Sequence, residues 1–76
     1  MTELILVLNA GSSSIKYAVF DGELRELHKG IAAEIGGTST LELNGEKQSV
    51  PLGSHREALD AILKKLAGEG VTPNNL

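Results

Sequence analysis

The chain has 76 residues, a formal net charge of −3 and no cysteine, so it forms at most one small domain, and disulfides and thiolate metal sites are excluded. Its two histidines are too few for a metal cluster without outside ligands, and the absence of a basic run argues against a nucleic-acid partner. The longest apolar stretch, residues 4–8, is too short to span a membrane, and the N-terminus lacks a secretory signal. We therefore expect a cytoplasmic chain with no membrane partner. A chain this short usually depends on a partner or belongs to something larger.

The first two elements are predicted as strands joined by a small, polar turn. Residues 4–8 are continuously apolar, which predicts a strand that is covered on both faces and central in its sheet. Residues 9–14 read Asn-Ala-Gly-Ser-Ser-Ser and form the turn. Residues 15–20 follow as a strand with alternating faces, so that Ile15, Tyr17 and Val19 share one face and Lys16, Ala18 and Phe20 share the other.

Three further segments continue a meander of strands. Asp21-Gly22 is a hairpin signal, because glycine tolerates the positive φ of tight turns. From Leu24 to Ile35 the apolar spacing is near-helical, yet Gly30 and the preceding turn favour a strand. Residues 36–39 form a loop. Residues 40–50 form a hairpin around a type I′ turn at Asn44-Gly45, with Leu43 opposite Glu46 and Glu42 opposite Lys47.

The last element is predicted as a helix that begins after Ser54. The pair Ser54 and Glu57 has capping-box spacing, in which Ser54 accepts from the Glu57 backbone N–H and Glu57 accepts from that of Ser54. Gly68 ends the helix. Its predicted apolar stripe consists of Ala58, Leu59, Ile62, Leu63 and Leu66. Strands followed by one covering helix predict an α/β fold, a mixed sheet with the helix on one face.

The turn at Gly11-Ser12-Ser13-Ser14 is the main candidate for chemistry. Its backbone N–H groups are not covered by bulky side chains, its hydroxyls can donate, and Lys16 adds a positive charge, which together suit a phosphate. The alternative is a flexible Gly/Ser linker, which the two flanking apolar strands disfavour. A Walker A loop is excluded, because its motif is absent and a strand follows the turn.

The nonapeptide from Leu8 to Lys16 closely resembles the N-terminal signature of acetate kinases, and the similarity extends over the whole chain. These enzymes belong to the sugar kinase, Hsp70 and actin superfamily. The resemblance implies a ribonuclease H-like (actin-like ATPase) fold, of which residues 1–76 form the incomplete N-terminal portion of the first domain. Family members are several times longer, and their arginines, catalytic aspartate and acetate pocket lie beyond position 76. The resemblance therefore implies no catalytic residue within this chain.

The resemblance also implies roles for four residues. Asn9 corresponds to the residue assigned to Mg²⁺, bound directly or through water, and Lys16 to the lysine assigned to ATP. Ser12 and Ser14 correspond to the hydroxyls that face phosphate. Many superfamily members carry aspartate where Asn9 stands. From the residues alone, Asn9 also suits an ordinary turn residue, and Lys16 a solvated strand lysine.

The activity implied by the resemblance is reversible transfer of the ATP γ-phosphoryl group to acetate with Mg²⁺, giving acetyl phosphate and ADP, by a full-length homodimer that contains the remainder of the kinase chain. Three alternatives stay open. One is propionate kinase, and another is a phosphate-binding module without catalysis. The third is a fragment that completes a partner's fold. His28 and His55 receive no role, and Glu34, Glu42 and Glu46 are expected to be solvated.

Overall fold

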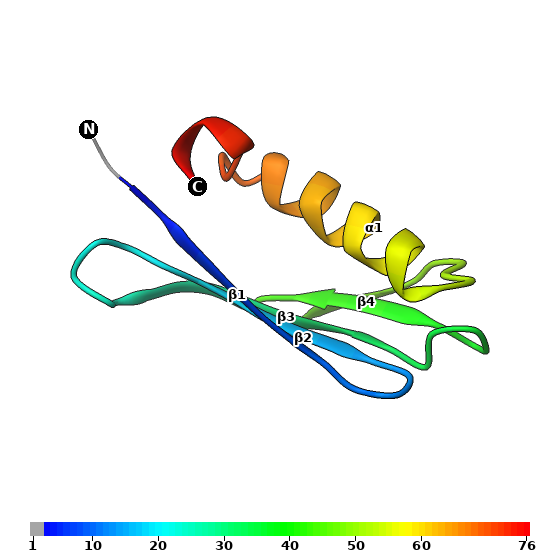
Figure 1. Ribbon diagram of the computed structural model, residues 1–76. Helices are drawn as coiled ribbons and strands as arrows, with labels where there is room; N and C mark the ends of the chain where they lie inside the picture. Colours follow the sequence, from blue (N-terminus) through cyan, green and yellow to red (C-terminus); the bar gives the residue numbers. More distant parts are fainter. Residues whose placement is uncertain (1–2) are drawn as a thin grey trace.

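The structure is a computed structural model that describes residues 3–76. Five strands form one sheet in the order β1-β2-β3-β4-β5, and helix α1 covers one face of it (Figure 1). The elements are β1 Ile5–Ala10, β2 Ile15–Phe20, β3 Glu26–Ala33, β4 Thr40–Leu43, β5 Glu46–Ser49, α1 His55–Ala67 and the short 3₁₀ helix Pro73–Asn75.

All four strand pairings within the described residues are antiparallel. The expected mixed sheet is therefore wrong for this part of the chain, because each strand is joined to the next by a short connection that reverses its direction. The α/β class, the strand meander and the following helix are confirmed. The third segment is a strand, and the last hairpin has the predicted register, with Glu42 opposite Lys47. Its turn has φ of 52° at Asn44 and 89° at Gly45, as a type I′ turn requires.

The core lies between the sheet and α1. Strand β2 presents Ile15, Tyr17 and Val19 to the helix, as its alternation predicts, and all three side chains are buried. The helix contributes Ala58, Ile62 and Leu66, each fully buried, whereas the predicted stripe residue Leu63 is 38% exposed. The remaining buried apolar residues are Ala32, Leu41, Leu43, Leu52 and Val71.

Helix α1 begins with half of the predicted capping box. Ser54 Oγ accepts from the backbone N–H of Glu57 at 3.2 Å, as expected. The Glu57 carboxylate reaches one residue further than predicted and accepts from the backbone N–H of Gly53 at 2.6 Å. Gly68 caps the other end, with its N–H directed to the carbonyls of Lys64 and Leu66.

The turn between β2 and β3 differs from the prediction. The left-handed conformation falls on Leu24, with φ of 64°, and not on Gly22. The reason is Asp21, whose carboxylate accepts from the backbone N–H groups of Glu23 and Arg25 and from the Arg25 Nε. These bonds set the path of the turn, and the hydrogen bonds from Arg25 lower the pKa of the Asp21 carboxyl.

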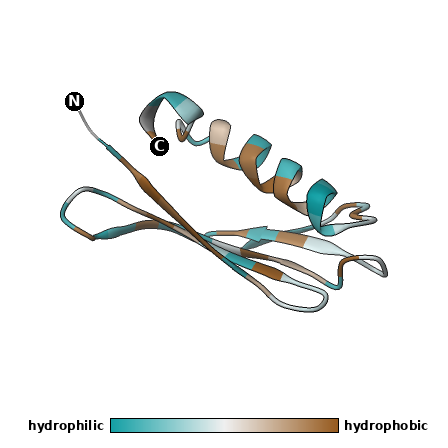
Figure 2. Ribbon diagram, viewed as in Figure 1, coloured by the Kyte–Doolittle hydropathy of each residue, from teal (hydrophilic) through white to brown (hydrophobic). Residues whose placement is uncertain are grey.

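Strand β1 occupies an edge of the sheet, which corrects the prediction that it is central. It also extends through Asn9 and Ala10, so the turn that follows is shorter than predicted. Three of its large apolar side chains are open, with Ile5 43%, Val7 48% and Leu8 43% exposed, whereas Leu6 packs against the core. The strand appears as an uninterrupted apolar band over most of its length (Figure 2). Residues 3–76 supply no strand to its outer edge.

Tyr17 and Gly30 together link the three strands β2, β3 and β4. They are register partners in β2 and β3, and the Tyr17 ring passes over Gly30 so that its hydroxyl donates to the backbone carbonyl of Glu42 in β4 at 2.6 Å. A Cβ at Gly30 would collide with that carbonyl oxygen and would lie 2.5 Å from the Tyr17 hydroxyl oxygen. The crossing of the ring therefore requires glycine.

We expect Gly30→Ala to lower the free energy of unfolding by about 1–3 kcal/mol or more, because the added methyl group must displace the ring or the β4 backbone. Urea denaturation followed by circular dichroism measures the loss. Gly22→Ala is the matched control, since a Cβ there meets nothing within 4 Å, and we expect a change within about 0.5 kcal/mol. Equal stability of the two variants would contradict the prediction.

Candidate functional site

Asn9 and Lys16 are direct partners across β1 and β2. Paired residues project from the same face of an antiparallel sheet, and the neighbours of Lys16 in β2, Ile15 and Tyr17, are buried on the helix side. Asn9 and Lys16 therefore project together from the face opposite α1, and both are exposed. Their row of register partners continues across the sheet through Ile31, Glu42 and Lys47.

The turn between these strands, residues 11–14, is held by three hydrogen bonds. The Gly11 N–H donates to the Ser14 carbonyl at 2.8 Å, which closes the turn on itself, and the Ile35 N–H donates to the Ser13 carbonyl at 2.9 Å. The third bond joins His55 Nε2 to the Gly11 carbonyl oxygen at 2.8 Å. The turn is therefore fixed from the segment after β3 and from the first residue of α1.

The three serines of the turn retain free hydrogen-bonding groups. Across residues 3–76, no hydrogen bond involves the backbone N–H or the hydroxyl of Ser12, Ser13 or Ser14. Ser12 and Ser13 are exposed and Ser14 is half-buried. The turn can therefore donate several hydrogen bonds to an anion beside the Lys16 strand, which is the chemistry expected of it.

His55 is the residue that sequence reasoning missed. The sequence indicates no role for it, yet it is half-buried and contacts a residue 44 positions earlier. The sequence carries no local signal for this contact, since it arises only when α1 packs across the sheet. The other histidine, His28, lies in β3 and is a hydrogen-bond partner of Asn44 in the turn between β4 and β5, with 2.9 Å between Nδ1 and the amide nitrogen.

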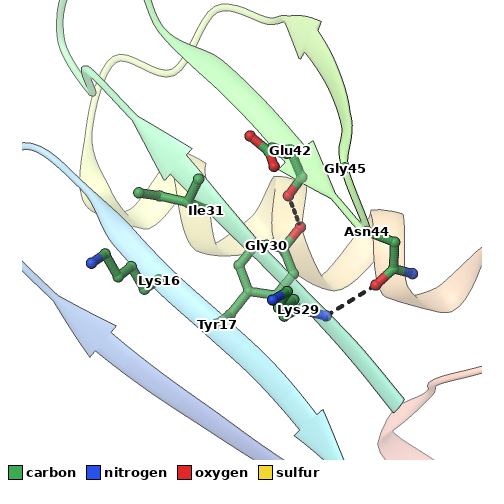
Figure 3. Close-up of a pocket in the computed structure, with 8 residues that line it drawn as sticks. All are labelled: Lys16, Tyr17, Lys29, Gly30, Ile31, Glu42, Asn44 and Gly45. Carbon is green, nitrogen blue, oxygen red and sulfur yellow. Dashed lines mark hydrogen bonds between the residues drawn. The ribbon is translucent and has the colours of Figure 1, made fainter. Parts of the chain in front are cut away.

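A cavity of about 510 Å³ opens beside Lys16 (Figure 3). Lys16 is the predicted site residue that lines it, whereas Asn9, Ser12 and Ser14 do not. The lining consists of Lys16, Tyr17, Lys29, Gly30, Ile31, Glu42, Asn44 and Gly45. Two lysines against one carboxylate give this cavity a net positive lining.

Tyr17 at the cavity wall resists ionisation. Burial of its hydroxyl raises the pKa of Tyr17 to about 12, and the nearby Glu42 carboxylate adds to the shift. Both causes disfavour the negatively charged phenolate. The hydroxyl therefore stays protonated and keeps its hydrogen bond to β4 at neutral pH.

A magnesium ion would find a limited set of ligands here. In residues 3–76, no group of three or more His, Asp or Glu side chains could hold a metal ion. Asn9 offers one neutral amide oxygen, and its cross-strand neighbour is the cation Lys16. This donor set would fit Mg²⁺ that is already coordinated by phosphate oxygens, and Asn9 is the residue that would contact the ion or one of its waters. It does not suit a bare ion.

The comparison with known proteins adds to this geometry. Residues 4–76 match the acetokinase family. The chain belongs to that family. A protein from Shewanella sp. (strain W3-18-1) named acetate kinase is 43% identical over 88% of this chain, and acetate kinases of Macrococcus caseolyticus and Clostridium botulinum are 36% and 41% identical. The predicted resemblance of the chain to acetate kinases is thus confirmed. This member of the acetokinase family spans about a fifth of the length of these relatives, 19% of the Shewanella protein.

The described part of the chain contains no helix of the length and apolar character needed to cross a membrane.

We expect Tyr17 to titrate near pH 12 in the folded chain and near 10 after unfolding. Because the folded pKa is the higher one, the stability contributed by the neutral hydroxyl is complete below pH 10 and is lost as pH rises toward 12. The sequence contains one tyrosine, so tyrosinate absorbance near 295 nm follows this group alone. The free energy of unfolding in urea, measured from pH 9 to 12, gives a second test. Tyr17→Phe is the control, because it lacks the part of the pH dependence that comes from Tyr17. A folded midpoint near pH 10 would contradict the prediction.

Proposed function

We propose that this chain is the N-terminal, phosphate-binding part of an acetate kinase. In the complete enzyme it would hold the phosphates of ATP and their Mg²⁺ while the γ-phosphoryl group passes reversibly to acetate, giving acetyl phosphate and ADP. The observation that carries the proposal is the pairing of Asn9 with Lys16 beside a turn whose serines have free donors. Membership of the acetokinase family and the names of the relatives support it.

The donors are assigned by charge and position. The N–H and hydroxyl groups of Ser12 and Ser14 donate to phosphate oxygens, and Lys16 balances their negative charge from the adjoining strand. Hydrogen bonds to charged groups contribute about 1.5–3 kcal/mol each, so several from one turn suffice to fix a phosphoryl group. Phosphoryl transfer depends mostly on such positioning and charge neutralisation.

Magnesium enters this proposal with the nucleotide. When bound, it neutralises charge on the transferring phosphate, and Asn9 is the residue of this chain that would contact it or its water shell. An amide in place of a carboxylate gives weaker coordination of the metal. The neutral amide also repels the phosphates less than a carboxylate would. This matters because Asn9 lies directly opposite Lys16, beside which the phosphates are proposed to bind.

The remaining four fifths of the kinase would complete the sheet. The exposed apolar residues of β1 and its open edge support this assignment, and the actin-like fold and homodimer of the full-length enzyme belong to the same proposal. A fragment that only completes a partner's fold is the second candidate, favoured by the same edge. Propionate is the alternative substrate, because the residues assigned here meet phosphate and metal and not the acyl group.

The proposal is tested in a chimera in which residues 4–76 replace the matching segment of the Shewanella acetate kinase. We expect acetyl phosphate formation from ATP and acetate, and a fall of about 10- to 100-fold in kcat/KM for MgATP in Lys16→Ala, because one charged hydrogen-bond donor is lost. Lys47→Ala is the matched control, since Lys47 lies in the same row of the same face three strands away from Lys16. We expect it to retain full activity.

Two results would count against the proposal. One is a well-folded chimera without kinase activity, which would favour the fold-completing role. The other is an active chimera in which Lys16→Ala and Lys47→Ala behave alike.

We expect the 76-residue chain alone to form no acetyl phosphate, because the resemblance assigns no catalytic residue to it. Acetyl phosphate is measured after incubation with MgATP and acetate, and the Lys16→Ala chain sets the background. A rate clearly above that background would show that the chain carries its own catalytic groups.

A further inference from the structure

The hydrogen bond from His55 to Gly11 has a defined direction. A backbone carbonyl oxygen can only accept, so His55 Nε2 must carry the proton in the 2.8 Å contact. A neutral His55 is therefore the Nε2–H tautomer, and a protonated ring keeps the same bond. The helix does not use the His55 ring for its own cap, since Ser54 Oγ accepts from the Glu57 N–H at that end.

Because peptide groups are planar, the direction of the Gly11 carbonyl also fixes the direction of the Ser12 N–H. No peptide bond in the described chain is cis, and in a trans peptide the C=O of one residue and the N–H of the next point in opposite directions. The Gly11 carbonyl points to His55, so the Ser12 N–H points away from it. The Ser13 carbonyl points to the Ile35 N–H, so the Ser14 N–H points away from Ile35.

We propose that His55 is a positioning residue for phosphate binding: by holding the Gly11 carbonyl toward α1, it aims the Ser12 N–H at the anion. The inference rests on the proposed function of the turn. Without the imidazole, the peptide between Gly11 and Ser12 is free to rotate and can turn its carbonyl oxygen toward the phosphate. That oxygen would repel the phosphate, where the N–H would bind it.

Three substitutions in the chimera separate this role from a general effect on folding. His55→Ala removes the donor. His55→Gln places an amide nitrogen near the position of Nε2, whereas His55→Asn places one near that of Nδ1. We expect a rise of about tenfold in the KM for MgATP in the Ala and Asn variants, an unchanged KM for acetate, and recovery of most of the affinity in the Gln variant.

The control is His28→Ala, which removes the chain's other histidine and its contact with Asn44 and leaves the turn intact. We expect the KM for MgATP of this variant to equal that of the unchanged chimera. Equal KM values for His55→Ala and His28→Ala would overturn the proposal, as would equal behaviour of the Gln and Asn variants.

A second measurement needs no activity. Long-range ¹⁵N–¹H spectra of the 76-residue chain distinguish the two neutral imidazole tautomers, and we expect Nε2–H for His55. Finding Nδ1–H would overturn the proposal even in an active chimera. An inactive chimera carrying the unchanged chain, together with the Nε2–H tautomer, would instead refute the phosphate function and leave the contact itself intact.

Discussion

The alternation of buried and more exposed residues along β2 is the constraint on which the rest of the structure depends. Its three buried residues seat the sheet on α1, and Lys16 lies between two of them in sequence. A shift of the β2 register by one residue would turn Lys16 toward α1 and Tyr17 toward solvent. Burial of the unpaired charge and exposure of the ring would both destabilise the fold. The same register places Lys16 beside Asn9 and Tyr17 over Gly30. Packing of β2 against α1 thus decides on which face of the sheet the candidate site residues Asn9 and Lys16 lie.

The site is shaped by contacts that are remote in sequence. The turn of residues 11–14 is closed by one internal hydrogen bond, but its other two bonds come from Ile35 and His55. Both donors hold carbonyl oxygens, which would otherwise compete with the N–H groups for the space near an anion. A short Gly/Ser turn has high conformational entropy when free. Two external anchors reduce the number of shapes that it can adopt, and so reduce the cost of ordering it on a ligand.

The local parts of this fold could be predicted from the sequence. Periodicity predicted β2 and the helix, the Asn44-Gly45 pair predicted the last hairpin with its register, and Ser54 predicted the start of the helix. For β3, Gly30 and the preceding turn outweighed a near-helical spacing of apolar residues. The errors arose where tertiary or side-chain contacts decide. In the turn after β2, the Asp21 carboxylate accepts from two backbone N–H groups, and the positive φ falls on Leu24 instead of Gly22.

The position of β1 and the role of His55 illustrate the limit of reasoning from sequence. The apolar run of β1 indicated a strand covered on both faces, but β1 lies at the sheet edge with Ile5, Val7 and Leu8 exposed. The residues of the candidate site could be proposed from the sequence because the turn is contiguous with both strands. The contact between His55 and Gly11 could not be predicted, because the two residues are 44 positions apart and meet only when the helix packs across the sheet.

The open edge of β1 also has a consequence for the behaviour of the chain in solution. Edge strands in soluble proteins are commonly protected by charges, prolines or bulges, and β1, with the sequence Ile-Leu-Val-Leu-Asn-Ala, has no charged residue and no proline. The backbone groups on its outer edge are therefore open to pairing with a further strand. Where no other strand covers this edge, it can pair with the β1 edge of a second copy, so the chain is prone to self-association through β1.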